Sequence, residues 1–482
     1  MATTQYDVIV IGAGAVGENV ADRAVQGGMS TVIVESELVG GECSYWACMP
    51  SKALLRSGAL LRAAQRVGGV AEAITGQLDV RAVLDRRDRV TSHWKDDGQV
   101  KWLEGAGIDL VRGHAVITAP REVTVTAADG TVTVLAARHA VAVSTGSAAL
   151  LPDIPGLRES EPWTSKDATS AQTVPASLAI LGGGVVAVEM ATAYAGFGTR
   201  VQLIARSSLL RANEPFAGEL VGDALRALGV TVHLDSEPSS VERTDDDGFR
   251  IQLSGGGTIE ADELLVAVGR VPNTIDLGLE AFGLEAGAWL DVDDTMRVLG
   301  ADGEPVDGGW LYGVGDVNHR ALLTHQGKYQ ARAAGDAIAA RGNGSPVRLE
   351  PWGTYVATAD HTAVPQVTFT DPEVASVGLT AAAAREAGYR IRVVDYPISS
   401  VAGATIASDD YTGQARMVVD EDRQVILGVT FVGQDVGELL HSATIAVVAE
   451  VPLDRLWHAV PSYPTLSEVW LRLLETYGRP EE

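Results

Sequence analysis

Cysteine is rare in this chain of 482 residues, since Cys43 and Cys48 are the only two. A chain of this length buries a large core and needs no covalent cross-link to be stable. Two thiols with four residues between them therefore favour redox or catalytic chemistry over a structural disulfide framework. The alternative is a pair of thiols that pack as small hydrophobic groups.

Lysine and arginine are few as well. The chain has 37 of them and 63 aspartates and glutamates, which gives a formal net charge of −26. A nucleic acid or an anionic membrane repels such a chain, so neither is expected as a partner. Long apolar stretches are missing too, because no uncharged run reaches the roughly 18 residues that a membrane helix needs. The N-terminus has no basic segment ahead of its apolar run, so no signal peptide is expected and the predicted location is cytoplasmic. The nine histidines form no metal-ligand cluster in the sequence, and no metal is predicted.

A nucleotide-binding pattern opens the chain. Residues 6–11 (YDVIVI) form an apolar, β-branched run that is typical of a strand buried on both faces. A glycine-rich turn follows, in which Gly12 permits the tight turn, Gly14 lets a pyrophosphate approach the backbone, and Gly17 lets the next helix pack on the strand. The helix N-terminus faces the phosphates, and Glu35, after a second strand, is placed to bind a ribose hydroxyl. This stretch predicts a dinucleotide site.

The pattern repeats after residue 176. The strand predicted at residues 177–181 leads into Gly182-Gly183-Gly184 and a helix, and the next strand ends at residue 204. Where the first site has Glu35, this one has Arg206, with Arg211 shortly after. An acid there favours NAD, whereas arginines suit a 2′-phosphate, so NADPH is predicted and NADH is the alternative. Two dinucleotides in one chain imply electron transfer between them.

Seven motifs in this order resemble the class I pyridine nucleotide–disulfide oxidoreductases, the family of dihydrolipoamide dehydrogenase, glutathione reductase and mercuric reductase. The resemblance covers essentially the whole chain. It implies an α/β chain with two Rossmann-like nucleotide-binding domains, for FAD and NAD(P)H, and a C-terminal α+β dimerisation domain. The expected bounds are 1–150 and 275–348 for the FAD-binding domain, 151–274 for the NAD(P)H-binding domain and 349–482 for the dimerisation domain. The motifs are GAGAVG with Glu35, GGECSYWACMPSK (40–52), STGS (144–147), GGGVVAVE (182–189), VGRVPN (268–273), GVGD (313–316) and residues 364–378.

The resemblance also implies the site residues. Those expected to bind FAD are Gly12, Gly14, Gly17, Glu35, Gly41, Lys52, Ala115, Thr145, Gly146, Ser147, Gly315 and Asp316. Those expected at the NAD(P)H site are Gly182, Gly184, Val185, Glu189, Arg206, Arg211 and Gly269. Lys52 and Glu189 match the family's ion pair beside the flavin, where they can tune its electrostatics, although simple pairing between domains is the alternative. A homodimer is expected, with the C-terminal motif of the partner subunit completing the active site.

By the same resemblance, Cys48 is the flavin-proximal thiolate, and Cys43 is the thiol that attacks a small external disulfide. The family supplies a His-Glu dyad for the proton, but here Tyr463 stands where the histidine is expected, while Glu468 is retained. A phenol titrates near about 10 and an imidazole near about 6.5, so Tyr463 does not exchange protons readily at neutral pH. It can donate a hydrogen bond or merely fill space, and His458 is an alternative proton carrier.

The redox motif departs from the family as well. Tyr45 and Trp46 replace small residues, and Glu42 stands where a threonine often faces the flavin phosphates, which argues against lipoamide or glutathione as substrate. Mercuric reductase needs a further C-terminal thiol pair, which this chain lacks. The predicted function is therefore reduction of a small disulfide of unknown identity. The alternatives are a quinone or dye reductase that uses the flavin directly, a carbon–sulfur branch of the family, and a non-enzymatic redox-sensing flavoprotein.

Overall fold

The apolar run near the N-terminus forms β1 (Thr3–Ile11), whose last four residues are almost fully buried. In the computed structural model, which describes residues 3–479, β1 lies inside a sheet of order β3-β2-β1-β6-β5-β4, and β16 also pairs with β6. The pairs β1–β2, β2–β3, β1–β6 and β6–β16 are parallel, and the excursion through β5 and β4 is antiparallel. The other strands are β2 (Thr31–Glu35), β3 (Asp109–Arg112), β4 (His114–Ala119), β5 (Glu122–Thr126), β6 (Val132–Val143) and β16 (Leu311–Gly313).

The described chain divides into two compact units, each assembled from segments that are far apart in sequence. The first unit holds residues up to 50, 88–149 and 270–360, and the second holds 51–87, 150–269 and the residues from 361 onward. The first unit contains the sheet just described and the helices α1 (Ala15–Gln26), α2 (Gly41–Tyr45), α5 (Asp97–Ala106) and α9 (Thr324–Gly342).

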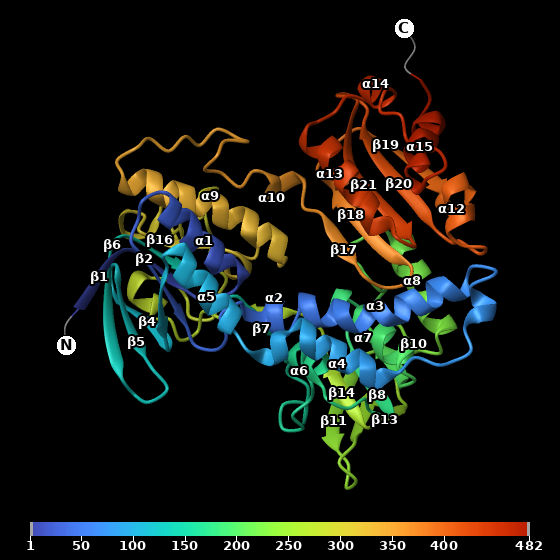
Figure 1. Cartoon of the computed structure of the whole chain (residues 1–482), viewed down its shortest axis with the longest axis horizontal. Coiled ribbons are helices and arrows are strands. Elements are labelled where there is room, and N and C mark those ends of the chain that lie inside the picture. The colour runs from blue at the N-terminus through green and yellow to red at the C-terminus, as the bar shows by residue number, and fades with distance from the viewer. Residues whose placement is uncertain (1–2, 480–482) are drawn as a thin grey trace. The chain divides into compact units, whose positions relative to one another are not determined.

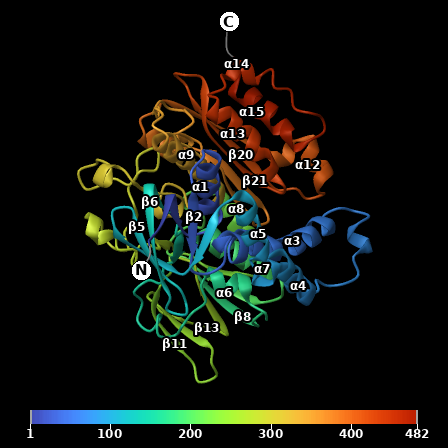
Figure 2. The ribbon, with the colours of Figure 1, turned by 60° about the vertical axis from the view of Figure 1, so that its left-hand side comes forward.

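Helices α1 and α9 lie side by side in the first unit (Figures 1 and 2). Glycines make the close approach possible: a Cβ on Gly335 would lie 2.5 Å from the Cβ of Arg23, and one on Gly327 would lie 2.6 Å from Cγ2 of Val16. The first turn of α9 therefore packs directly on the first turn of α1, next to the glycine loop that precedes α1.

The second unit repeats the strand–turn–helix unit. All five residues of β8 (Ser177–Leu181) are buried, as expected for a strand covered on both faces. It belongs to a parallel sheet of order β10-β9-β8-β14. The other elements are β9 (Arg200–Ile204), β10 (Thr231–His233), β14 (Glu263–Val266), α6 (Ser165–Ser170), α7 (Val185–Gly196) and α8 (Pro215–Ala227).

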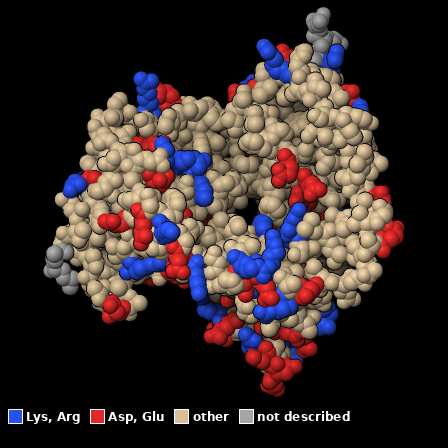
Figure 3. Space-filling model, in the orientation of Figure 1, with Lys and Arg blue, Asp and Glu red and all other residues tan. Residues whose placement is uncertain are grey.

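An antiparallel sheet of β11 (Pro238–Arg243), β12 (Phe249–Leu253) and β13 (Thr258–Ala261) follows β10 in the same unit. Its inner face buries Val241, Phe249 and Ile251. The turn between β11 and β12 carries three consecutive exposed aspartates at residues 245–247, and red acidic side chains mark this tip at the lower end of Figure 3.

The C-terminal segment forms an antiparallel sheet of order β17-β18-β21-β20-β19. All nine residues of β21 (Val425–Gly433) are buried at its centre. The other strands are β17 (Gln366–Thr368), β18 (Glu373–Gly378), β19 (Ile391–Pro397) and β20 (Gln414–Asp420). The helices are α11 (Ala381–Glu386), α12 (Ala402–Ala407), α13 (Leu440–Val448), α14 (Leu453–Leu456) and α15 (Val469–Tyr477).

The long helix α3 (Cys48–Gln65) continues from the second cysteine into the second unit. There its arginines hold one carboxylate: Arg62 Nε lies 2.6 Å and Arg66 Nη1 lies 2.8 Å from Asp371, a half-buried residue just before β18. These two guanidinium groups hold the pKa of Asp371 below its ordinary value in spite of burial.

The remaining α-helices and strands are α4 (Val80–Val90), α10 (Ala359–Thr362) and the paired strands β7 (Ser147–Ala149) and β15 (Arg270–Pro272).

Within residues 3–479, no helix combines the length and the apolar character that crossing a membrane requires.

Candidate active site

The first glycine loop is built for close backbone contact. A Cβ on Gly12 would lie 2.5 Å from the carbonyl oxygen of Ser144, and one on Gly17 would lie 1.9 Å from the carbonyl oxygen of Gly12. Gly14 caps α1 without a side-chain hydrogen bond, so the first amides of this helix are left without a capping side chain and can donate to a ligand. Glu35, at the end of β2, accepts a hydrogen bond from the backbone N–H of Ala13 at 2.7 Å. The predicted acid, Glu35, thus makes direct contact with the glycine loop.

The redox motif begins beside this loop. The N–H of Gly40 donates to the carbonyl of Ala13 at 2.7 Å, and a Cβ on Gly41 would lie 2.7 Å from the Cα of Gly14. Gly40 and Gly41 both have positive φ, which only glycine adopts without strain. The cysteine-bearing helix α2 therefore starts in contact with the nucleotide loop.

Four motifs that are far apart in sequence meet at Arg270. Its guanidinium donates to Oγ of Ser147 at 2.6 Å and to Glu42 at 2.5 Å, and Ser147 Oγ donates to Asp316 at 2.6 Å. The residues belong to the predicted STGS, GGEC and GVGD motifs and to VGRVPN. The carboxylate of Glu42 is thus held by an arginine, a contact that the sequence analysis missed because no local spacing links residues 42 and 270.

The remaining predicted residues of the first unit lie in the loop after β6, in the GVGD turn and in the core strand β4. Thr145 and Asn273 exchange two hydrogen bonds, at 2.7 and 2.9 Å, which pin the loop after β6 next to Gly146. Gly315 has a positive φ and donates its N–H to Gln330 at 2.9 Å. Ala115 is a core residue in β4, 4% exposed, where only its backbone can reach a ligand.

These features fit an FAD molecule. The residues present an uncapped helix N-terminus for a pyrophosphate, a glycine loop that a Cβ would fill, and a carboxylate at the end of β2 for a ribose. All of them lie in the first unit.

The cysteine pair lies beside the start of α9. Cys43 is in α2 and Cys48 opens α3; both are half-buried thiols in the structure. Cys48 Sγ lies 3.3 Å from Oγ1 of Thr324. A hydrogen bond with Cys48 and then burial raise the pKa of the Cys43 thiol, while Thr324 and the ammonium of Lys328 act to lower it. Thr324 and Lys328 were not predicted; their position at the start of a helix after GVGD was the available signal.

Tyr45 is a packing residue of this loop. Its ring is 2% exposed, its hydroxyl donates to the carbonyl of Val39 at 3.1 Å, and its own carbonyl accepts the indole N–H of Trp94 at 3.1 Å. Burial, with a contribution from Asp96, raises the pKa of Tyr45 to about 12. Trp46 meets it edge to face, with ring centroids 5.7 Å apart. The bulky pair thus braces the segment between the two cysteines.

Lys52 and Glu189 form the predicted ion pair. Lys52 Nζ lies 2.8 Å from Oε2 of Glu189, whose side chain is 3% exposed, and the backbone N–H of Phe369 donates to Oε1 at 2.9 Å. The ammonium also lies 4.7 Å from the centre of the Phe369 ring. Glu189, on α7, therefore has both oxygens satisfied, which is what a buried carboxylate requires.

The second glycine loop has the same construction as the first. A Cβ on Gly182 would lie 2.1 Å from the carbonyl oxygen of Ala267, whereas one on Gly184 meets nothing within 4 Å. Gly184 caps α7 without a side-chain hydrogen bond, and Val185 next to it is exposed. Gly269, with φ of +151°, lies against Leu150. This loop fits a second dinucleotide.

Arg206 and Arg211 lie on a loop that is tied to this glycine turn. The N–H of Leu210 donates to the carbonyl of Gly183 at 2.8 Å. Both arginines are exposed, and neither makes an ion pair or a side-chain hydrogen bond within the described part of the chain. Two unpaired guanidinium groups thus flank the predicted site for the nucleotide.

The C-terminal motif is arranged in an unexpected way. Tyr463 is 76% exposed, whereas Glu468 is buried. Glu468 Oε1 accepts from Arg472 at 2.5 Å, and its Oε2 accepts from the N–H of Ala402 at 3.3 Å. Within residues 3–479, no hydrogen bond joins His458, which is exposed, to either residue. The retained glutamate thus anchors α12 and α15 of its own subunit.

Glu18 is a buried carboxyl that the sequence analysis did not single out. It lies in the first turn of α1, is 7% exposed, and its Oε1 has no hydrogen-bond partner among the described residues. Burial raises its pKa from 4.5 to about 7; Lys328 opposes this rise and Glu35 adds to it.

This shift predicts a pH-dependent stability. Because the folded chain holds the Glu18 proton more tightly than the unfolded chain, the free energy of unfolding falls as pH rises from 4.5 to 7, by about 3 kcal/mol. We expect Glu18→Gln to remove this fall, so that the variant is more stable than the parent above pH 7 and similar to it near pH 4. Urea unfolding across this range measures the difference. Glu104→Gln, at an exposed position of α5, is the control and should leave the pH profile unchanged; an identical profile for Glu18→Gln would contradict the prediction.

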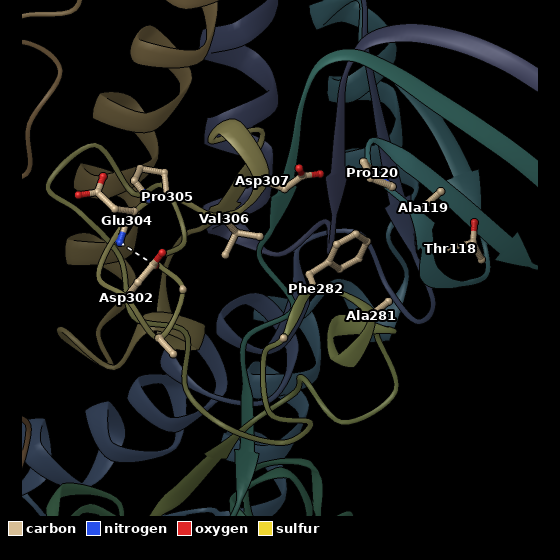
Figure 4. Close-up of a pocket in the computed structure, with 13 residues that line it drawn as sticks. Thr118, Ala119, Pro120, Ala281, Phe282, Asp302, Glu304, Pro305, Val306 and Asp307 are labelled. Carbon is tan, nitrogen blue, oxygen red and sulfur yellow. Dashed lines mark hydrogen bonds between the residues drawn. The ribbon is translucent and has the colours of Figure 1, made fainter.

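A cavity of about 780 Å³ in the first unit lies apart from all predicted site residues. Figure 4 shows Phe282 and Val306 beside it, with the acidic side chains of Asp302, Glu304 and Asp307 around the rim. None of the predicted nucleotide or redox residues lines it. Among residues 3–479, no cluster of three histidine, cysteine, aspartate or glutamate side chains is arranged to hold a metal ion.

Two glycine loops, each after a strand with parallel neighbours, together with one cysteine pair are the features of a class of redox proteins that bind two dinucleotides. Comparison with known families gives the same result. The family model described as pyridine nucleotide-disulphide oxidoreductase matches residues 6–336, and the model of that family's dimerisation domain matches residues 364–473. The chain therefore belongs to the pyridine nucleotide–disulphide oxidoreductase family, and it is an FAD-dependent enzyme of that family.

Individual relatives span almost the whole chain. A dihydrolipoyl dehydrogenase of Chlorobaculum tepidum is 33% identical over 473 residues, which cover 96% of this chain and 95% of that protein. A mercuric reductase of Acidithiobacillus ferrooxidans is 30% identical over 480 residues, covering 98% and 83%. A solved Cu(II) complex of the HOCl-induced flavoprotein disulfide reductase RclA from Escherichia coli superimposes with a TM-score of 0.82 at 23% identity, covering 98% of this chain and 99% of that one. This last likeness shows a shared fold.

The comparisons confirm the predicted family, the fold class of two Rossmann-like domains with a dimerisation domain, and the prediction of an enzyme. Family membership implies FAD and a pyridine nucleotide as cofactors. The division at residues 150, 274 and 348, the roles of the single site residues, and the cytoplasmic location stay predictions.

Proposed function

We propose that the protein reduces a small disulfide with NADPH through a Cys43–Cys48 disulfide. The observation that carries this proposal is the position of the cysteine pair: the helix bearing Cys43 starts against the first glycine loop, and Cys48 lies 3.3 Å from Thr324 at the start of α9. A cysteine pair that exchanges electrons with a flavin must lie next to the flavin-binding loop. Two inert thiols would have no need of that position.

The chain's own residues perform the exchange. When bound, FAD and the nicotinamide supply the two electrons that open the Cys43–Cys48 disulfide. The Cys43 thiolate then attacks a sulfur of the external disulfide, forming a mixed disulfide and releasing one substrate thiolate. The Cys48 thiolate attacks Cys43, which releases the second substrate thiolate and restores the enzyme disulfide. The substrate gains two electrons and the cysteine pair loses two.

NADPH is the proposed reductant because two exposed arginines, Arg206 and Arg211, flank the second glycine loop without any partner in the described chain. Arginine binds phosphate with two parallel hydrogen bonds, so these groups suit the 2′-phosphate that distinguishes NADPH from NADH.

A homodimer is part of the proposal, with an FAD-binding domain at 1–150 and 275–348, an NADPH-binding domain at 151–274 and a dimerisation domain at 349–482. The match of residues 364–473 to a dimerisation domain supports the dimer. In it, the partner subunit's Tyr463 is proposed to face the cysteine pair. Its exposure of 76% within its own chain suits a residue that acts on another subunit.

Thiol counting tests the function. We expect the isolated protein to show no free thiol after denaturation and two after anaerobic treatment with NADPH, because the chain has two cysteines. NADPH oxidation with a panel of small disulfides should then exceed the rate with oxygen alone. If NADPH leaves the thiol count unchanged, the disulfide mechanism is wrong.

A second function, direct reduction of a quinone or dye by the flavin, is favoured by one observation. Position 463 carries a phenol, and Glu468 is held by Arg472 and Ala402, so this motif supplies no imidazole for thiol exchange. A quinone needs no cysteine. The Cys43 variant described in the Discussion separates the two functions.

A further inference from the structure

The first turn of α9 brings two polar side chains to the cysteine pair. Thr324 and Lys328 are four residues apart, so they lie on the same face of the helix. Thr324 Oγ1 lies 3.3 Å from Cys48 Sγ, which fixes the direction of that face. Gly327 between them packs on Val16 of α1, so this turn cannot shift without displacing the nucleotide-binding helix.

Lys328 is a half-buried cation without a close partner. Within residues 3–479 its ammonium forms no hydrogen bond and no ion pair. Its charge acts to lower the pKa of two neighbouring groups, the Glu18 carboxyl on α1 and the Cys43 thiol on α2. Partly removing an ammonium from water is costly unless a negative charge compensates it. A thiolate that forms on Cys43 during reaction would supply such a charge.

Thiol exchange requires that charge. Cys43 attacks only as a thiolate, yet its neighbour Cys48 and its burial both raise the pKa of the Cys43 thiol. In the family, the imidazolium of a histidine usually compensates the negative charge of the thiolate. This chain has Tyr463 at the position of that histidine. Two groups of α9 favour the ionised form of Cys43, the Thr324 hydroxyl and the Lys328 ammonium.

We propose that Lys328 is a positioning residue whose fixed positive charge stabilises the Cys43 thiolate, with Thr324 orienting the pair. This inference rests on the proposed function, since only a disulfide reductase needs the Cys43 thiolate. In this proposal, α9 of the same subunit supplies the positive charge that stabilises the thiolate. The C-terminal motif, which has Tyr463 in place of a histidine, does not supply it.

Alkylation measures the thiolate directly. In a Cys48→Ser background Cys43 is the only thiol of the chain, so the rate of carboxamidomethylation by iodoacetamide against pH gives its pKa without substrate or turnover. We expect Lys328→Gln to raise that pKa by about one unit, the effect of losing one nearby opposite charge. Lys328→Arg should preserve it. Arg332→Gln removes an exposed charge from the next turn of α9 and should leave the pKa unchanged.

The outcomes separate cleanly. An unchanged pKa in Lys328→Gln overturns the inference, as does an equal rise in Arg332→Gln. If Lys328→Gln does not fold, Lys328→Met takes its place, because it keeps an unbranched side chain of similar size that carries no charge. Because the alkylation uses chemically reduced full-length protein, its result is independent of the NADPH-driven thiol count, so a failure of the proposed function and a failure of this inference remain distinguishable.

Discussion

Replacing Cys43 by serine is expected to lower disulfide reduction more than about 10³-fold, as loss of a covalent nucleophile does. The serine hydroxyl cannot form the mixed disulfide, and Cys48 alone cannot close the exchange. Both cysteines are needed because the chain contains no third thiol that can substitute. Steady-state oxidation of NADPH with the best disulfide of the panel measures the loss.

The same variant decides between the two candidate functions. If the flavin passes electrons directly to a quinone, quinone reduction should survive Cys43→Ser with little loss, whereas disulfide reduction should not. Ser44→Ala is the matched control, since it changes the next residue of α2 and leaves both thiols. Disulfide reduction that persists in Cys43→Ser would rule out the cysteine mechanism. Flavin content, measured by absorbance, confirms that each variant is folded.

Replacing Arg206 and Arg211 together by glutamine is expected to lower kcat/KM for NADPH by roughly 10²-fold or more, while kcat/KM for NADH changes much less. Hydrogen bonds to a charged group are worth about 1.5–3 kcal/mol each, so two of them account for a loss of this size. The loop that carries both arginines is fixed to the glycine turn through Leu210 and Gly183, so the guanidinium groups are held near the proposed phosphate.

Arg200→Gln is the control for this experiment. Arg200 is exposed on the same strand, β9, but at the opposite end from the glycine turn. It should leave the ratio of NADPH to NADH unchanged. An equal fall with both nucleotides in the double variant would show that the arginines serve stability, and no fall with either would remove the basis for NADPH.

The sequence predicted those features that depend on residues close together in the chain. The turn that needs Gly12, the helix start after Gly14 and the acid Glu35 lie within one strand–turn–helix–strand segment, so their spacing alone specifies the nucleotide loop. The cysteine pair was also found from sequence, because two isolated thiols in one short motif are unusual in a long chain. The family resemblance added the pairing of Lys52 with Glu189, which the structure brings to 2.8 Å.

Contacts between distant segments were beyond the reach of the sequence. Glu42 was noted only as a departure from threonine, and the structure shows that Arg270 holds it. The catalytic role of Glu468 stays a prediction, and the structure adds a hydrogen bond to it from the N–H of Ala402, 66 positions earlier in the chain. Lys328 was not predicted, since a lysine in a helix is ordinarily a solvated charge and its place just after GVGD does not by itself indicate a contact with the cysteine pair.

The amino-acid sequence alone therefore predicted the two nucleotide loops and singled out the cysteine pair, because backbone turns, strand periodicity and an isolated motif are all encoded by neighbouring residues. Tertiary structure decided the electrostatics of the site. The approach of α9 to α1 brings the charge of Lys328 to bear on the pKa of both Glu18 and Cys43, although 285 positions separate Lys328 from Cys43 in the chain. A charge is stabilised or penalised by what surrounds it in space, and folding alone supplies that surrounding.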